Sequence, residues 1–168
     1  MSLRSRSVAA GVGIVALGAL VLGVATRDRT PPLTRAALDR ARATWRLRGL
    51  IDYDITLQKE VDQRPSEVIR TEIRGGKAVR LVLNKAELPV SDSYSVAGLF
   101  ETLEAELEMK EGNDPKPGQP ANAILRTRFD DRLGVPVFIH RLATNRQSYA
   151  MRVLRVESPG GQVAWEKP

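Results

Sequence analysis

The feature that most constrains this chain is an uninterrupted apolar run from Val8 to Ala25, with no charged or strongly polar residue. At 1.5 Å per helical residue, these 18 residues span about 27 Å, close to the ~30 Å hydrocarbon core of a bilayer. The apolar region of a secretory signal is usually shorter, at about 7–15 residues. We therefore predict a retained transmembrane signal-anchor helix at residues 8–26. The alternative is a signal peptide cleaved after the small residues at 23–25.

Basic residues flank this run on both sides, so the positive-inside rule is nearly balanced. The likeness of the first residues to a signal segment favours a cytoplasmic N-terminus at residues 1–7 and a main domain outside the cytoplasm. Small residues recur four apart within the run, and such pairs permit close helix packing. They are candidate partner contacts in the membrane: Ala9, Gly13, Ala19 and Gly23.

The rest of the chain is predicted to be one domain. About 140 residues follow the apolar run, which suits a single modest core. We divide them into a linker at 27–33, an extracytoplasmic α+β domain at 34–157 and a C-terminal tail at 158–168. The chain has 26 Lys and Arg against 20 Asp and Glu. It has no Cys, which excludes disulfides, Cys-based metal sites and a lipid-modified N-terminal cysteine.

Hydrophobic periodicity predicts the elements of this domain. A helix should begin after Thr34, which suits an N-cap, and end near Arg48, before a glycine at 49. Strict alternation then indicates a strand at 51–58, and Gly75-Gly76 is typical of a tight hairpin between strands at 67–74 and 77–83. A second helix at 96–111 precedes three more strands, at 123–129, 137–142 and 149–156. The expected fold is α+β, with two helices on one face of a roughly six-stranded antiparallel sheet in αβββ–αβββ order.

Four short motifs occur in an order that resembles a family of bacterial secreted or lipid-anchored domains of unknown function. The motifs are "ATWRLRGLIDYDI", "IRGGKAVRLV", "SVAGLFETLEAEL" and "RTRFDDRLGVPVFI". The matching positions are Trp45, Gly49, Tyr53, Gly76, Leu99, Phe100, Phe129, Asp130, Gly134 and Pro136. The resemblance covers residues 36–156 and implies a bacterial envelope location and this fold. It brings no activity, and the cysteines that often follow the first strand in that family are absent here.

No set of residues in the sequence indicates catalysis. His140 is the only histidine, it lies in a predicted strand, and no GxSxG elbow accompanies it. Asp52 and Asp54 share one face of their strand, but an i, i+2 carboxylate pair is common on a solvated sheet. Asp130 and Asp131 are the other carboxylates weighed as an acid–base pair or calcium site, and no EF-hand pattern surrounds them. We predict no enzymatic activity, no metal site and no cofactor.

Residues 27–48 contain seven Arg and two Asp, directly after the apolar run. Their candidate contacts are anionic lipid headgroups or an acidic protein surface, and the alternative is a solvated face. We select Arg27, Arg29, Arg35 and Arg42 as candidate membrane or partner contacts. Few aromatic residues lie among these arginines, so we do not expect nucleic acid. Trp165, near the end of the tail, needs burial against its own domain or a neighbour.

These observations predict a non-catalytic, single-pass protein of the bacterial inner membrane with a periplasmic main domain. That domain would pack on integral membrane proteins as an accessory subunit of a complex, for example a respiratory or photosynthetic one. The alternative is an envelope binding module for a peptide, glycan or small molecule, secreted after signal cleavage.

Overall fold

The computed structural model describes residues 30–62, 64–112, 123–143, 147–159 and 161–167. The helical elements are α1 (Arg35–Arg48), the short 3-10 helix η1 (Asp92–Tyr94) and α2 (Val96–Gly112). The strands before α2 are β1 (Tyr53–Val61), β2 (Glu67–Arg74), β3 (Lys77–Leu83) and β4 (Ala86–Leu88). Those after α2 are β5 (Ala123–Phe129), β6 (Pro136–Ala143), β7 (Tyr149–Glu157) and β8 (Val163–Glu166).

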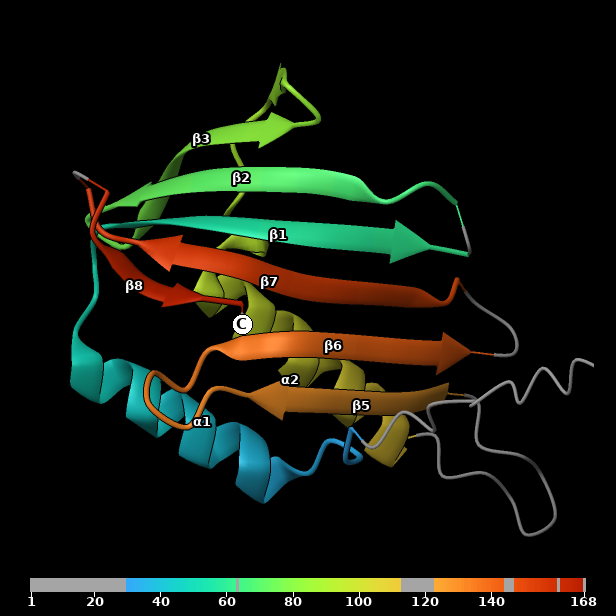
Figure 1. Cartoon of the computed structure of the whole chain (residues 1–168). Helices are drawn as coiled ribbons and strands as arrows, with labels where there is room; N and C mark the ends of the chain where they lie inside the picture. Colours follow the sequence, from blue (N-terminus) through green and yellow to red (C-terminus); the bar gives the residue numbers. More distant parts are fainter. Residues whose placement is uncertain (1–29, 63, 113–122, 144–146, 160, 168) are drawn as a thin grey trace, which may run out of the picture.

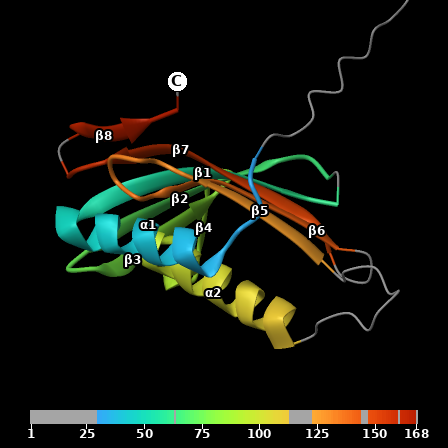
Figure 2. The ribbon, with the colours of Figure 1, turned by 90° about the horizontal axis from the view of Figure 1, so that it is seen from below.

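These strands form one antiparallel sheet in the order β4-β3-β2-β1-β7-β6-β5, and β8 pairs with β7 outside this path. Each half of the chain forms its own meander, and the β1–β7 pairing joins the two halves at the centre of the sheet. Both long helices lie against the same face of the sheet, so its other face is uncovered by helices (Figures 1 and 2). We call that second surface the open face.

Local signals at both ends of α1 explain its length. The Thr34 side chain accepts a hydrogen bond from the Ala37 amide at 3.2 Å, which confirms it as the N-cap. Gly49 ends the helix with φ of 63°, in the left-handed region that favours glycine. Between them, Leu38 and Trp45 are buried at helical spacing, and the Trp45 ring meets that of Tyr53 edge-on at 5.2 Å.

Two polar contacts hold α2 over the sheet. The Val96 amide, at the start of the helix, donates to the Tyr53 hydroxyl of β1 at 3.0 Å. Further along, Glu106 accepts a hydrogen bond from the Arg141 Nε of β6 at 2.9 Å. Arg141 also donates to the Gln147 carbonyl at 2.6 Å, so this buried guanidinium is held from two sides.

The predicted architecture is wrong in three respects. The described residues form eight strands, because β4 and β8 extend the two halves beyond three strands each. The αβββ–αβββ order therefore does not hold, and part of the predicted tail is a strand of the sheet. The predicted transmembrane helix at 8–26 lies outside the described residues. Among the residues that the structure describes, no helix combines the length and apolar character needed to cross a bilayer.

The segment that enters the domain is tied to the edge of β5. The Leu33 amide donates to the Leu125 carbonyl at 2.9 Å, and the Thr127 amide donates to the Pro31 carbonyl at 3.2 Å. An Arg126 guanidinium nitrogen also donates to the Thr30 carbonyl at 3.0 Å. Figure 2 shows this segment running from α1, on the helix side, past β5 toward the open face. The preceding residues therefore join the domain at this edge.

Candidate binding surface

The alternation of β5, β6 and β7 assigns their side chains to the two faces of the sheet. In β6, Ile139 and Arg141 are buried on the helix side, where Arg141 meets Glu106 of α2. The residues that alternate with these two along the strand therefore point to the open face. The same reasoning applies to β5, where Leu125 and Thr127 are buried, and to β7, where Met151 and Val153 are buried.

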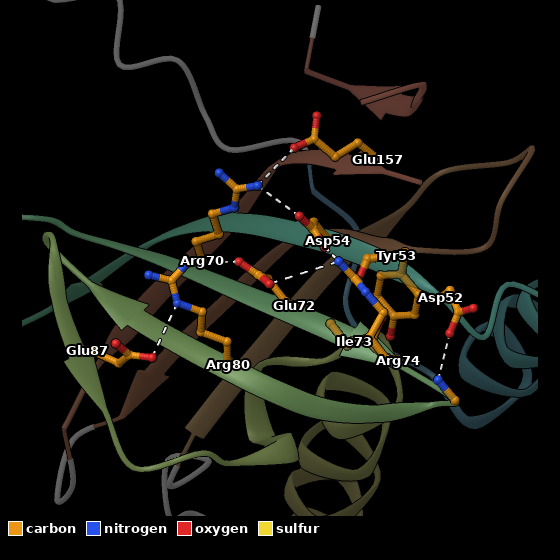
Figure 3. Close-up of polar contacts among 11 residues, drawn as sticks. Asp52, Tyr53, Asp54, Arg70, Glu72, Ile73, Arg74, Arg80, Glu87 and Glu157 are labelled. Carbon is orange, nitrogen blue, oxygen red and sulfur yellow. Dashed lines mark hydrogen bonds and ion pairs between the residues drawn. The ribbon is translucent and has the colours of Figure 1, made fainter. Parts of the chain in front are cut away.

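One half of the open face, over β1, β2, β3, β4 and the end of β7, carries a network of ion pairs (Figure 3). At its centre, Asp54 accepts a hydrogen bond from Arg70 and another from Arg74, each at 2.8 Å. Arg80 extends the network to Glu72 and Glu87. We call this group the charged network: Asp54, Arg70, Glu72, Arg74, Arg80, Glu87, Arg155 and Glu157. Its charges are largely matched within the protein.

Asp54 is the buried member of this network, with only 7% of its surface exposed. Burial alone would raise the pKa of Asp54, but hydrogen bonds from Arg70 and Arg74, supported by their charges, outweigh it and hold the pKa below its usual value. A carboxylate with a lowered pKa is a poor proton donor or acceptor near neutral pH. The geometry therefore assigns Asp54 a structural role.

Replacing Asp54 with Asn should destabilise the protein by about 1.5 kcal/mol at neutral pH, because hydrogen bonds to charged groups are worth about 1.5–3 kcal/mol and both arginines are partly exposed. The folded-state pKa is lowered, so this stability is present above the unfolded pKa of about 3.9 and is lost as pH falls through the folded value. Urea unfolding at a series of pH values measures the stability difference between wild type and D54N. The exposed Asp131→Asn is the control. An unchanged difference between wild type and D54N down to the lowest pH would contradict the assignment.

The other half of the open face has a different character. Its outward side chains come from β5, β6 and the first half of β7, and none of those described is acidic. Ile124 and Leu142, cross-strand partners, are 46% and 43% exposed. We call this surface the basic patch: Ile124, Arg126, Arg128, Phe138, His140, Leu142 and Arg152.

One row across the sheet organises the basic patch. Arg128 of β5 is directly opposite Phe138 of β6, which is opposite Arg152 of β7. The Arg152 guanidinium lies 5.2 Å from the Phe138 ring centroid, an arrangement that attracts a cation to the aromatic face. Both arginines are exposed, and no carboxylate among the described residues pairs with either. The row therefore presents two cations around an aromatic ring.

The candidate contacts selected from sequence lie elsewhere. Arg35 and Arg42 of α1 both contact Glu104 of α2, at 3.2 and 2.7 Å, so they connect the two helices. Trp165 lies in β8 and packs, partly buried, against the domain's own core. The remaining candidates are outside the described residues: Ala9, Gly13, Ala19, Gly23, Arg27 and Arg29.

The structure does not bring together the carboxylates that were considered for an acid–base pair or a calcium site. Asp52 accepts a hydrogen bond from the Gly75 amide at 2.6 Å, and Asp130 accepts one from the Leu133 amide at 2.7 Å, so each stabilises a turn. His140 lies on the open face, with its ring 5.9 Å from Phe138. Within the described ranges, no cluster of three His, Asp or Glu residues is arranged to hold a metal ion.

No family model, curated protein or solved structure significantly matches this chain. The resemblance to bacterial envelope domains therefore stays a prediction from sequence, as do the bacterial inner-membrane location and the periplasmic domain.

Sequence reasoning missed the basic patch, although a signal for it exists. Arg126 and Arg128 are two apart in β5, and Phe138 and His140 are two apart in β6. Alternation shows that these residues share a face of their own strand. It does not show that β5, β6 and β7 are neighbours, nor which face the helices cover.

Proposed function

We propose that this chain is a non-catalytic accessory protein of a membrane assembly, and that its domain docks on that assembly through the basic patch. The observation that carries the proposal is the composition of the patch: two exposed aliphatic side chains, and the exposed Arg128 and Arg152, which pair with no carboxylate among the described residues. Surfaces that combine apolar area with arginine and aromatic residues are typical of interaction sites.

Comparison with the charged network supports the choice of the basic patch as the docking surface. Its arginines are already paired with Asp54, Glu72 and Glu157, so a partner would have to replace existing ion pairs to bind there. Arg128 and Arg152 of the basic patch have no ion pair with a described carboxylate that a partner would have to replace. The apolar run at residues 8–25 supports a membrane location, on sequence grounds alone.

Co-purification with charge-reversal variants tests the proposal. From gently solubilised membranes, we expect the native protein to migrate on a native gel within a larger complex at fixed stoichiometry. Arg128→Glu with Arg152→Glu should release it, because both charges in the row around Phe138 are reversed. Arg40→Glu with Arg46→Glu is the matched control, since these exposed α1 residues change the net charge equally.

Other outcomes are also informative. Release by the α1 variant but not by the patch variant would contradict the proposal and restore the interpretation that residues 27–48 form the contact. A wild-type protein that runs alone, with an intact mass beginning near residue 26, would favour the secreted binding module instead. That module would then be screened for a shift on adding peptides or glycans.

A further inference from the structure

We infer that the basic patch rests on an anionic lipid headgroup surface, so that the open face of the sheet is the membrane-facing side of the domain. This inference rests on the proposed function, because it takes the patch to be the surface by which the domain docks at the membrane assembly, and it assigns the lipid headgroups of that assembly's membrane as what the surface meets. Two independent observations support it: where the N-terminal segment joins the domain, and the chemistry of the patch.

The first observation concerns distance along the chain. Only four residues, 26–29, separate Ala25, at the end of the apolar run, from Thr30. Five Cα–Cα steps reach at most about 18 Å, even fully extended. Thr30 is itself held at the β5 edge by Arg126, and Pro31 by Thr127. A bilayer that takes up the apolar run must therefore lie within about 18 Å of this edge.

The direction from which the N-terminal segment enters the domain indicates which face of the sheet is turned to the membrane. The segment at 30–34 comes past β5 from the side of the open face before it reaches α1 on the helix side (Figure 2). Arg126 and Arg128 lie on the open face of that same strand. Thr30, which Arg126 holds, and the basic patch are thus on the same side of the domain, whereas α1 and its arginines lie on the other.

The second observation is the chemistry of the patch. Arginines attract phosphate groups, and the contribution of basic residues near an anionic membrane falls off within about a Debye length of the surface. Arg128 and Arg152 supply such charges, while Ile124 and Leu142 supply exposed apolar side chains at the other end of the patch, beyond the Arg126–His140 row. A headgroup layer with acyl chains beneath it offers complementary partners to both kinds of side chain. An acidic protein surface would match only the arginines.

Site-specific quenching tests this orientation with the full-length chain. Because the chain has no cysteine, a single Cys at Leu142→Cys or Arg40→Cys can carry a fluorophore without background labelling. The first position is on the open face and the second is on exposed α1. Each labelled protein is reconstituted into vesicles of phosphatidylcholine with phosphatidylglycerol, or of phosphatidylcholine alone, both containing a headgroup-nitroxide lipid.

We expect the label at 142 to be quenched in the anionic vesicles and the label at 40 to remain unquenched. Adding Arg128→Glu and Arg152→Glu should reduce quenching at 142 to the level at 40, as should high salt. Losing two basic contacts of about 1 kcal/mol each corresponds to a roughly 30-fold weaker surface association. Circular dichroism of each variant verifies that the domain stays folded.

Equal quenching at both positions, or none at 142 in anionic vesicles, would overturn the inference. Quenching at 142 that is the same with and without phosphatidylglycerol would also overturn it, because the contact would then not depend on anionic headgroups. If the patch variant leaves the native assembly while vesicles give no quenching at 142, the partner is a protein, and the proposed function stands without this inference. If neither effect occurs, both fail.

Discussion

Replacing Gly134 with alanine is expected to lower the free energy of unfolding by about 3 kcal/mol. Gly134 has φ of 76°, where an L-residue costs about 1–2 kcal/mol. It also lies against α1: an added Cβ would overlap the Ala41 carbonyl oxygen and approach the Trp45 amide nitrogen to 2.9 Å. These are backbone atoms of a helix, so the β5–β6 turn or α1 would have to move, at a further cost of about 1–3 kcal/mol.

A second glycine separates the two causes. Gly161 has a similar φ of 86°, but nothing lies within 4 Å of its added Cβ. Gly161→Ala should therefore show only the conformational cost, of about 1 kcal/mol. Urea unfolding followed by far-ultraviolet circular dichroism gives both values. Equal losses for the two variants would show that the close approach of the turn to α1 has no energetic importance.

Replacing Glu106 with leucine is the second change from which we expect a large effect. The Glu106 and Arg141 side chains are 16% and 7% exposed, and their ion pair joins α2 to β6. Removing only the carboxylate leaves a buried guanidinium without its anionic partner, which typically costs about 3–5 kcal/mol. We expect the lower end of this range, since Arg141 keeps its bond to the Gln147 carbonyl.

The double variant Glu106→Leu with Arg141→Met should recover most of this loss, to within about 1 kcal/mol of wild type. Buried ion pairs can often be replaced by apolar side chains of similar volume at little cost, because the desolvation penalty of both charges disappears. Chemical denaturation of the two variants measures the difference directly. A double variant as unstable as the single one would mean that shape at this site matters more than charge.

The helix α1 and the β2–β3 hairpin could be predicted because the residues that fix their ends lie close together in sequence. The Thr34 cap, the Gly49 terminator and the Gly75-Gly76 turn act on residues a few positions away. The strands β2, β3 and β5 accordingly have the predicted bounds. By contrast, β4 and β8 are three and four residues long, too short for alternation to reveal. They exist as strands through pairing, as where Trp165 lies opposite Val156.

The candidate contact residues also show that sequence reveals local features but not which residues become neighbours in the fold. A dense group of arginines at 27–48 is visible in the sequence, but Arg42 has a nearby carboxylate only because α1 packs beside α2, with Glu104 facing it. Likewise, Arg128 and Arg152 are unremarkable in sequence, 24 positions apart. They become one surface because β5, β6 and β7 are adjacent in the sheet.

The sequence by itself determined where the helices begin and end and where the β2–β3 hairpin turns. These properties depend on backbone preferences and short-range periodicity. Only the tertiary structure decided which arginines are matched by carboxylates within the protein and which, like Arg128 and Arg152, are exposed without such a match among the described residues. That outcome depends on β1 meeting β7 across about one hundred residues and on the helices covering one face of the sheet. Burial and charge matching are properties of side chains brought together from distant parts of the chain, and no local pattern specifies those neighbours.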